Sequence, residues 1–219
     1  MIKKTTTLLE NAKKDYKYPF FLFTLATYLF IPSIVTQSFA EILANILFVL
    51  FIVSSLTLVS SKSKKVVIFT YCVGILGISA EIVHYFIQPL NTNIHVVLML
   101  IMFVYFITLL SELIRQIFKS KVITRNVLLG AFSGYIMIGI IGYFVFRIIF
   151  LTKPESFAIP EYSKQDLLYF TFITLTTIGY GDISPITDPA RNFAIILGLV
   201  GQFYNSVIIA IIIGKFLQK

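Results

Sequence analysis

The residues of this sequence that can do chemistry are concentrated in one stretch, Thr176 to Asp182, which reads Thr-Thr-Ile-Gly-Tyr-Gly-Asp. Successive backbone carbonyls that point toward one axis can replace the water shell of a cation and bind it at a fixed distance. Such a backbone uses angles that L-residues tolerate poorly, so glycines have to alternate with residues that carry side chains. Gly179 and Gly181 stand at the two positions that need glycine. The stretch therefore predicts a carbonyl-lined cation site.

This stretch resembles the selectivity filter of the potassium channel family, whose usual pattern is T-V-G-Y-G-D. Ile178 replaces the valine of that pattern and keeps its β-branch. The resemblance implies that K⁺ ions bind in the filter, with the Thr177 hydroxyl at the inner mouth, and that no organic cofactor is needed. Ile178 and Tyr180 are expected to pack behind the loop. The expected ion-binding residues are Thr177, Ile178, Gly179, Tyr180 and Gly181.

The composition indicates an integral membrane protein. The chain has 219 residues, of which 58% are hydrophobic and 13% charged, and its mean hydropathy is +0.91. The net charge of +8 lies in short runs between apolar segments, which argues against a nucleic-acid partner. Cys72 is the single cysteine, so no disulfide can form within the chain.

Six apolar segments are long enough to cross a bilayer as helices. They run over about 18–36, 39–60, 66–87, 94–113, 127–150 and 191–214. A shorter segment, 165–176, introduces the filter and is expected to be a re-entrant pore helix whose C-terminal end points at the central cavity. The expected fold is all-α, with the pore helix and filter between the fifth and sixth membrane helices.

The distribution of charge predicts the orientation of the chain. If the N-terminus is cytoplasmic, most of the 18 Lys and Arg residues fall on the inner side, as the positive-inside rule requires. Both termini are then cytoplasmic and the filter is extracellular. We expect a multi-pass protein of the plasma membrane, which is the inner membrane if the source is bacterial.

The chain divides into four predicted regions. They are a cytoplasmic tail at 1–17, a four-helix domain that resembles a voltage sensor at 18–118, a linker at 119–126 and a pore domain at 127–219. One filter loop cannot encircle an ion, so four identical chains must assemble around one axis. About five residues follow the sixth span, so no cytoplasmic ligand-binding domain is expected beyond it.

The fourth span lacks the charges of a voltage sensor. A sensor carries arginine or lysine at every third position, whereas this span offers His95 at its outer edge and Glu112 at its inner edge. The chain is thus similar to six-span tetrameric potassium channels of the prokaryotic type, without a charged sensor, and weak voltage dependence is expected. A stripe after the fourth span favours an interfacial linker helix or a straight extension of that span; it consists of Ile114, Ile117, Phe118 and Val122.

The resemblance also assigns supporting roles to Tyr169 and Gly201. Tyr169 precedes Asp182 by thirteen residues, and in similar channels an aromatic residue at this spacing donates a hydrogen bond to the filter aspartate. The alternative for Tyr169 is simple packing. Gly201 follows Asp182 by nineteen residues, the position of the gating-hinge glycine in similar channels. Close helix packing is the alternative for Gly201.

Two further pairs of polar residues lie inside apolar segments. Gln202 and Asn205 share one helical face, so they are expected to line the cavity or to form hydrogen bonds between helices. Glu81 and His84 lie three residues apart on the third span, where they are expected to sense external pH or to form hydrogen bonds between helices.

A potassium-selective channel that conducts K⁺ passively is the function that these patterns predict. A non-selective cation channel is the first alternative, although such filters usually lose the tyrosine or the second glycine. A potassium-uptake transporter with a related pore is the second, although such transporters carry four loops in one chain. No cluster of metal ligands or nucleophile–base pair indicates an enzyme.

Overall fold

The computed structural model describes residues 2–31, 37–59, 64–86, 92–120, 122–159 and 164–217. Over these ranges the chain is predominantly helical, in agreement with the predicted all-α class. The helices are α1 (Ile2–Phe30), α2 (Gln37–Leu58), α3 (Lys64–Phe86), α4 (Thr92–Lys119), α5 (Arg125–Thr152), α6 (Lys164–Leu175) and α7 (Asp188–Leu217). A 3-10 turn (Pro154–Ser156) and two short strands, β1 (Phe157–Ala158) and β2 (Ser184–Pro185), lie around α6.

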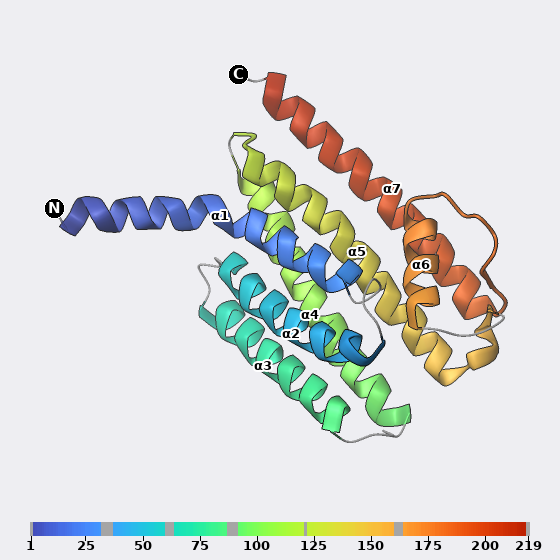
Figure 1. The fold of residues 1–219 in the computed structure, drawn as a ribbon. Helices are drawn as coiled ribbons and strands as arrows, with labels where there is room; N and C mark the ends of the chain where they lie inside the picture. Colours follow the sequence, from blue (N-terminus) through green and yellow to red (C-terminus); the bar gives the residue numbers. More distant parts are fainter. Residues whose placement is uncertain are drawn as a thin grey trace.

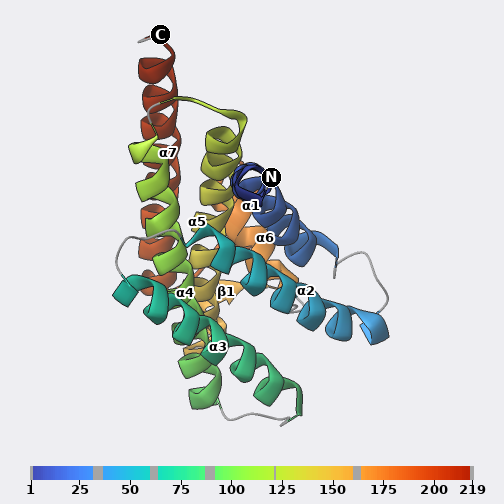
Figure 2. The same ribbon diagram turned by 90° about the vertical axis from the view of Figure 1, so that its left-hand side faces the viewer.

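The helix α5 lies at the centre of the molecule (Figure 1). On one side it packs against α4 and α1. The helix α4 also contacts α3, and α1 contacts α2 (Figure 2). On the other side it contacts α6 and α7, which also pack against each other. The short connection 120–124 joins α4 to α5, so α4 runs back along the α5 of its own chain. This order places the predicted filter on the side of α5 that faces away from α2 and α3.

Three helices are long and apolar enough to cross a membrane among the residues that the structure describes. These are α4, α5 and α7, and shorter apolar stretches occur in α2 and α3 at Leu43–Leu58 and Val66–Ser79. The fifth and sixth predicted spans thus correspond to α5 and α7, and the fourth to α4. That the first three segments also cross the membrane stays a prediction.

The boundaries of α1 and α4 differ from the predicted regions. Residues predicted as a separate tail belong to the same helix as the first span, because α1 continues through Pro19. Pro32, a residue that favours a kink near the end of the first predicted span, lies outside the described residues. The helix α4 continues to Lys119, which is the straight extension and not a separate linker helix. Leu113 and Ile117 are almost fully buried, so their face packs against protein.

The interior of the first four helices is aromatic. The rings of Phe51 and Phe106 stack with their centroids 5.3 Å apart and their planes at 12°. The ring centroids of Phe21 and Phe51 are 5.5 Å apart. The hydroxyl groups of Thr24 on α1 and Ser54 on α2 form a hydrogen bond with their oxygen atoms 2.6 Å apart. Packing of this kind places apolar rings where a voltage sensor would need water and charged partners for moving arginines.

The C-terminal end of α7 is tied to the C-terminal end of α4. Lys215 donates to the carbonyl oxygens of Ile117 at 3.0 Å and Phe118 at 3.2 Å, and to that of Ser120 at 2.5 Å. The last carbonyls of a helix have no partners within it, and its C-terminus favours a cation. Lys215 therefore caps α4 from a distant part of the chain.

Candidate functional site: a loop of backbone carbonyls after α6

The backbone of the filter stretch alternates in handedness. Thr177, Gly179 and Gly181 have φ angles of +61°, +55° and +82°, whereas Ile178 and Tyr180 between them are not in the positive region. Alternation of left- and right-handed conformations turns successive peptide groups toward one side of the chain. This is the arrangement that a line of cation-binding carbonyls requires.

The two glycines are needed for conformation and not for space. A Cβ atom added to Gly179 or Gly181 would meet no atom within 4 Å in the single chain. Their positive φ angles nevertheless strain any L-residue. Thr177 also has such an angle. Its hydroxyl donates a hydrogen bond to the Thr176 carbonyl at 2.6 Å.

The first half of the loop is hydrogen-bonded to the last turn of α6. The amides of Ile178 and Gly179 both donate to the carbonyl of Ile173, at 2.9 and 3.1 Å, and the amide of Thr177 donates to that of Thr174 at 3.1 Å. The carbonyls that end a helix lack partners within it. The filter backbone satisfies them, so its inner half is fixed to the pore helix.

The outer half of the loop is held by a side chain and by a strand pair. Tyr169 donates from α6 to a carboxylate oxygen of Asp182 at 2.7 Å, so the hydrogen bond predicted from their spacing is present. Beyond Asp182, β2 pairs with β1, and the Ile186 amide donates to the Ser156 carbonyl at 2.8 Å. The segment after the filter is thus anchored to the segment before α6.

A single chain covers the loop from one side. The side chains of Ile178 and Tyr180 are 54% and 72% exposed, so neither packs behind the loop within one chain as predicted. The loop is therefore open on the side of these two residues in the single chain.

Gly201 lies where α7 passes the end of α6. A Cβ atom at this position would stand 3.0 Å from the Leu175 carbonyl oxygen and 2.6 Å from its Cδ1 atom. The structure thus gives Gly201 a role in close packing, which was the alternative to the hinge. The hinge role stays a prediction. Gly198 and Gly214, by contrast, have open space around an added Cβ.

The predicted cavity residues lie beside the buried stripe of α7. Tyr204 and Ile208 are buried, Gln202 is exposed and Asn205 is half-buried. Within the described part of one chain, neither side-chain amide forms a hydrogen bond with another residue. Among the described residues, hydrogen bonds to neighbouring helices of the same chain therefore do not occupy these two amides.

The side chains of Glu81 and His84 lie outside the described residues. Their role in pH sensing stays a prediction. The backbone at both positions belongs to α3.

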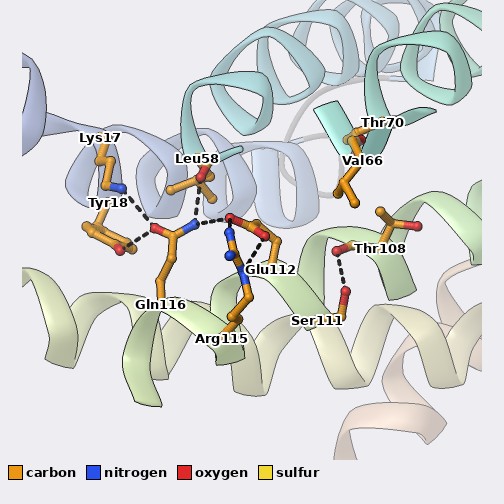
Figure 3. Close-up of polar contacts among 10 residues, drawn as sticks. All are labelled: Lys17, Tyr18, Leu58, Val66, Thr70, Thr108, Ser111, Glu112, Arg115 and Gln116. Carbon is orange, nitrogen blue, oxygen red and sulfur yellow. Dashed lines mark hydrogen bonds and ion pairs between the residues drawn. The ribbon is translucent and has the colours of Figure 1, made fainter. Parts of the chain in front are cut away.

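Glu112 and Arg115, near the C-terminal end of α4, form an ion pair within one helix (Figure 3). Arg115 forms a two-pronged contact with Glu112, at 2.5 and 2.9 Å. Gln116 donates to Glu112 at 3.1 Å and to the Leu58 carbonyl at the end of α2 at 2.7 Å. It also accepts from Lys17 on α1 at 2.8 Å. This network ties α4 to its neighbours and leaves Arg115 with its charge paired.

Tyr135 was missed in the sequence analysis. Its hydroxyl donates from α5 to the Leu175 carbonyl at 3.0 Å. The signal in the sequence was a hydroxyl inside an apolar span, because such a group must find a partner away from lipid. The identity of that partner was not readable from spacing.

Comparison with known proteins agrees with the site. Residues 130–219 match the family described as Ion channel. The chain is 42% identical over 55 residues to two pore potassium channel c of Oryza sativa subsp. japonica. This match covers 25% of this chain and 12% of that protein. It is 36% identical over 53 residues to two-pore potassium channel 5 of Arabidopsis thaliana. This match covers 24% of this chain and 13% of that protein. Both relatives are potassium channels by name.

A third relative extends the similarity to another organism. The chain is 36% identical over 77 residues to small conductance calcium-activated potassium channel-like protein 3 of Caenorhabditis elegans, covering 32% of this chain and 11% of that protein. The chain thus spans a small fraction of the length of the curated relatives it matches. No solved structure matches the chain.

Proposed function

We propose that the protein is a potassium-selective channel that conducts K⁺ passively through the carbonyls of Thr177 to Gly181. The observation that carries this proposal is the alternating backbone, with positive φ at Thr177, Gly179 and Gly181. It occurs in the segment that matches the ion channel family. Tyr169 and Asp182 support the loop from behind through their hydrogen bond.

The channel is proposed to be a homotetramer. The open side of the filter, with Tyr180 72% exposed, supports completion of the ring by further copies. The apolar surface of α7 supports the same assembly, because large exposed apolar patches mark lipid or subunit contacts. Its exposed residues include Ile195, Leu199, Phe203, Ile209 and Ile213.

The membrane arrangement completes the proposal. Six helices cross the plasma membrane, the inner membrane in a bacterium, with both termini cytoplasmic and α1 to α4 forming a domain that resembles a voltage sensor. Similarity to the ion channel family supports transport and not catalysis. Gln202 and Asn205 line the cavity below the filter, and Gly201 lets α7 pass close to the pore helix.

Reversal potentials test the proposed selectivity. With K⁺ on one side and Na⁺ on the other of a bilayer that contains the purified protein, the current is expected to reverse far from zero, with the K⁺-containing side negative. A non-selective channel would reverse near zero under these conditions. A transporter would give no unitary current steps. Either result contradicts the proposal.

The conductance is expected to depend only weakly on voltage. Each elementary charge that crosses the membrane field supplies about 2.3 kcal/mol per 100 mV. The fourth helix holds an aromatic core and a cation already paired with Glu112, so little charge is available to move. Voltage steps in the same recordings measure the slope. A curve that requires several gating charges per subunit would overturn the expectation.

A further inference from the structure

The last turn of α6 has four carbonyls without partners inside the helix, as every α-helix does. Those of Phe172, Ile173 and Thr174 accept hydrogen bonds from backbone amides of the residues that follow them, between Thr176 and Gly179. The fourth, from Leu175, takes its hydrogen bond from Tyr135 on α5 at 3.0 Å. Four backbone hydrogen bonds to three carbonyls thus join the residues after α6 to its last turn, and one bond joins α6 to α5.

The Leu175 carbonyl is enclosed. The side chain of Leu175 is fully buried, and an added Cβ at Gly201 would stand 3.0 Å from the carbonyl oxygen. With α7 this close on one side and Tyr135 on the other, the oxygen has little room for a substitute water. A buried carbonyl that loses its donor is left unsatisfied, which is more costly than the loss of an exposed hydrogen bond.

The ring of Tyr135 is itself held in place by Tyr204. The two rings stack with their centroids 6.2 Å apart and their planes at 28°. Tyr204 donates to the Ala131 carbonyl at 2.7 Å. It fits beside α5 because Gly134 has no side chain, since a Cβ there would stand 2.2 Å from the Tyr204 hydroxyl. Packing thus restricts Tyr135 to one position.

We propose that the Tyr135 hydroxyl is a positioning group for the inner end of the filter. It fixes the Leu175 carbonyl, and Thr176 and Thr177 follow that residue directly. The filter is bonded to the last turn of α6, so the height of the innermost ion site relative to α5 then depends on the bond from Tyr135 to Leu175. This inference rests on the proposed potassium channel function. It adds a residue outside the filter that determines how much K⁺ the filter needs to stay ordered.

The test compares Tyr135→Phe with Tyr204→Phe in the full chain reconstituted in bilayers. Each change removes one hydroxyl that donates to a backbone carbonyl, and each keeps the stacked ring. The channels are exposed to Na⁺-rich solutions that contain decreasing concentrations of K⁺, and the current is then measured. The reported quantity is the K⁺ concentration during exposure at which half of the current is preserved. Tyr135→Phe is expected to raise it about fivefold, the factor that corresponds to roughly 1 kcal/mol for one hydrogen bond. Tyr204→Phe is expected to change it by less than about twofold, because the bond from Tyr204 to Ala131 joins α7 to α5 and involves neither α6 nor the filter.

Rescue separates positioning from packing. Tyr135→4-aminophenylalanine keeps a donor at the same place and is expected to return the K⁺ requirement toward that of the unaltered protein. If Tyr135→Phe alone fails to assemble, co-expression with an excess of unaltered chain dilutes it among normal subunits, and a smaller upward shift is expected. An unchanged K⁺ requirement in either preparation, or an equal shift in Tyr204→Phe, overturns the inference. If the unaltered protein passes no K⁺-selective current, the proposed function itself has failed.

Discussion

Replacing Gly179 or Gly181 with alanine is expected to abolish K⁺-selective current. Both residues have positive φ angles, +55° and +82°, and an L-residue in the left-handed region costs about 1–2 kcal/mol. In the proposed tetramer this strain occurs four times around one ring. The chain can relieve it by rotating the peptide group, which turns a carbonyl away from the ion. Reversal potentials in mixed K⁺ and Na⁺ solutions measure the loss.

Gly214→Ala is the matched control for these variants. Gly214 also has open space around an added Cβ, but it lies within α7 in a helical conformation that alanine prefers. Selectivity and current are expected to stay unchanged in this variant. Unaltered selectivity in both filter variants would mean that their backbone angles are not required for ion binding.

Asn205→Asp is expected to produce strong block by internal Mg²⁺ or polyamines while potassium selectivity is retained. If Asn205 lines the cavity, the substitution places four carboxylates around one axis and attracts polyvalent cations from the cytoplasm. Their mutual repulsion opposes full ionisation, so not all four need carry charge. Selectivity is unaffected because the filter loop is unchanged. Currents recorded with and without internal Mg²⁺ at several voltages measure the block.

Asn205→Leu provides the neutral comparison, because it removes the amide without adding charge. Little new block is expected from it. If Asn205 instead contacts a neighbouring subunit, the aspartate would be buried without a partner, and the tetramer would assemble poorly. Misassembly without block in Asn205→Asp would therefore reject the cavity position.

Local sequence determined the features whose causes are local. Gly179 and Gly181 were predicted from the alternation that a carbonyl-lined loop needs, and both have positive φ angles. The bond between Tyr169 and Asp182 was predicted from the resemblance, because in similar channels an aromatic residue at this spacing donates to the filter aspartate, and the bond is present. The long apolar segments likewise became helices, since backbone groups away from water have to be satisfied within the segment.

The tertiary structure decided the features that depend on contacts between distant residues. The sequence offered a hinge or close packing for Gly201, and the proximity of Leu175 supports packing. The bond from Tyr135 to Leu175 and the cap that Lys215 places on α4 join residues 40 and 98 positions apart. A periodic pattern reports which face of a helix is apolar, but not which neighbour it meets. Those partners are set by how the helices pack around α5, and the position of the filter depends on them.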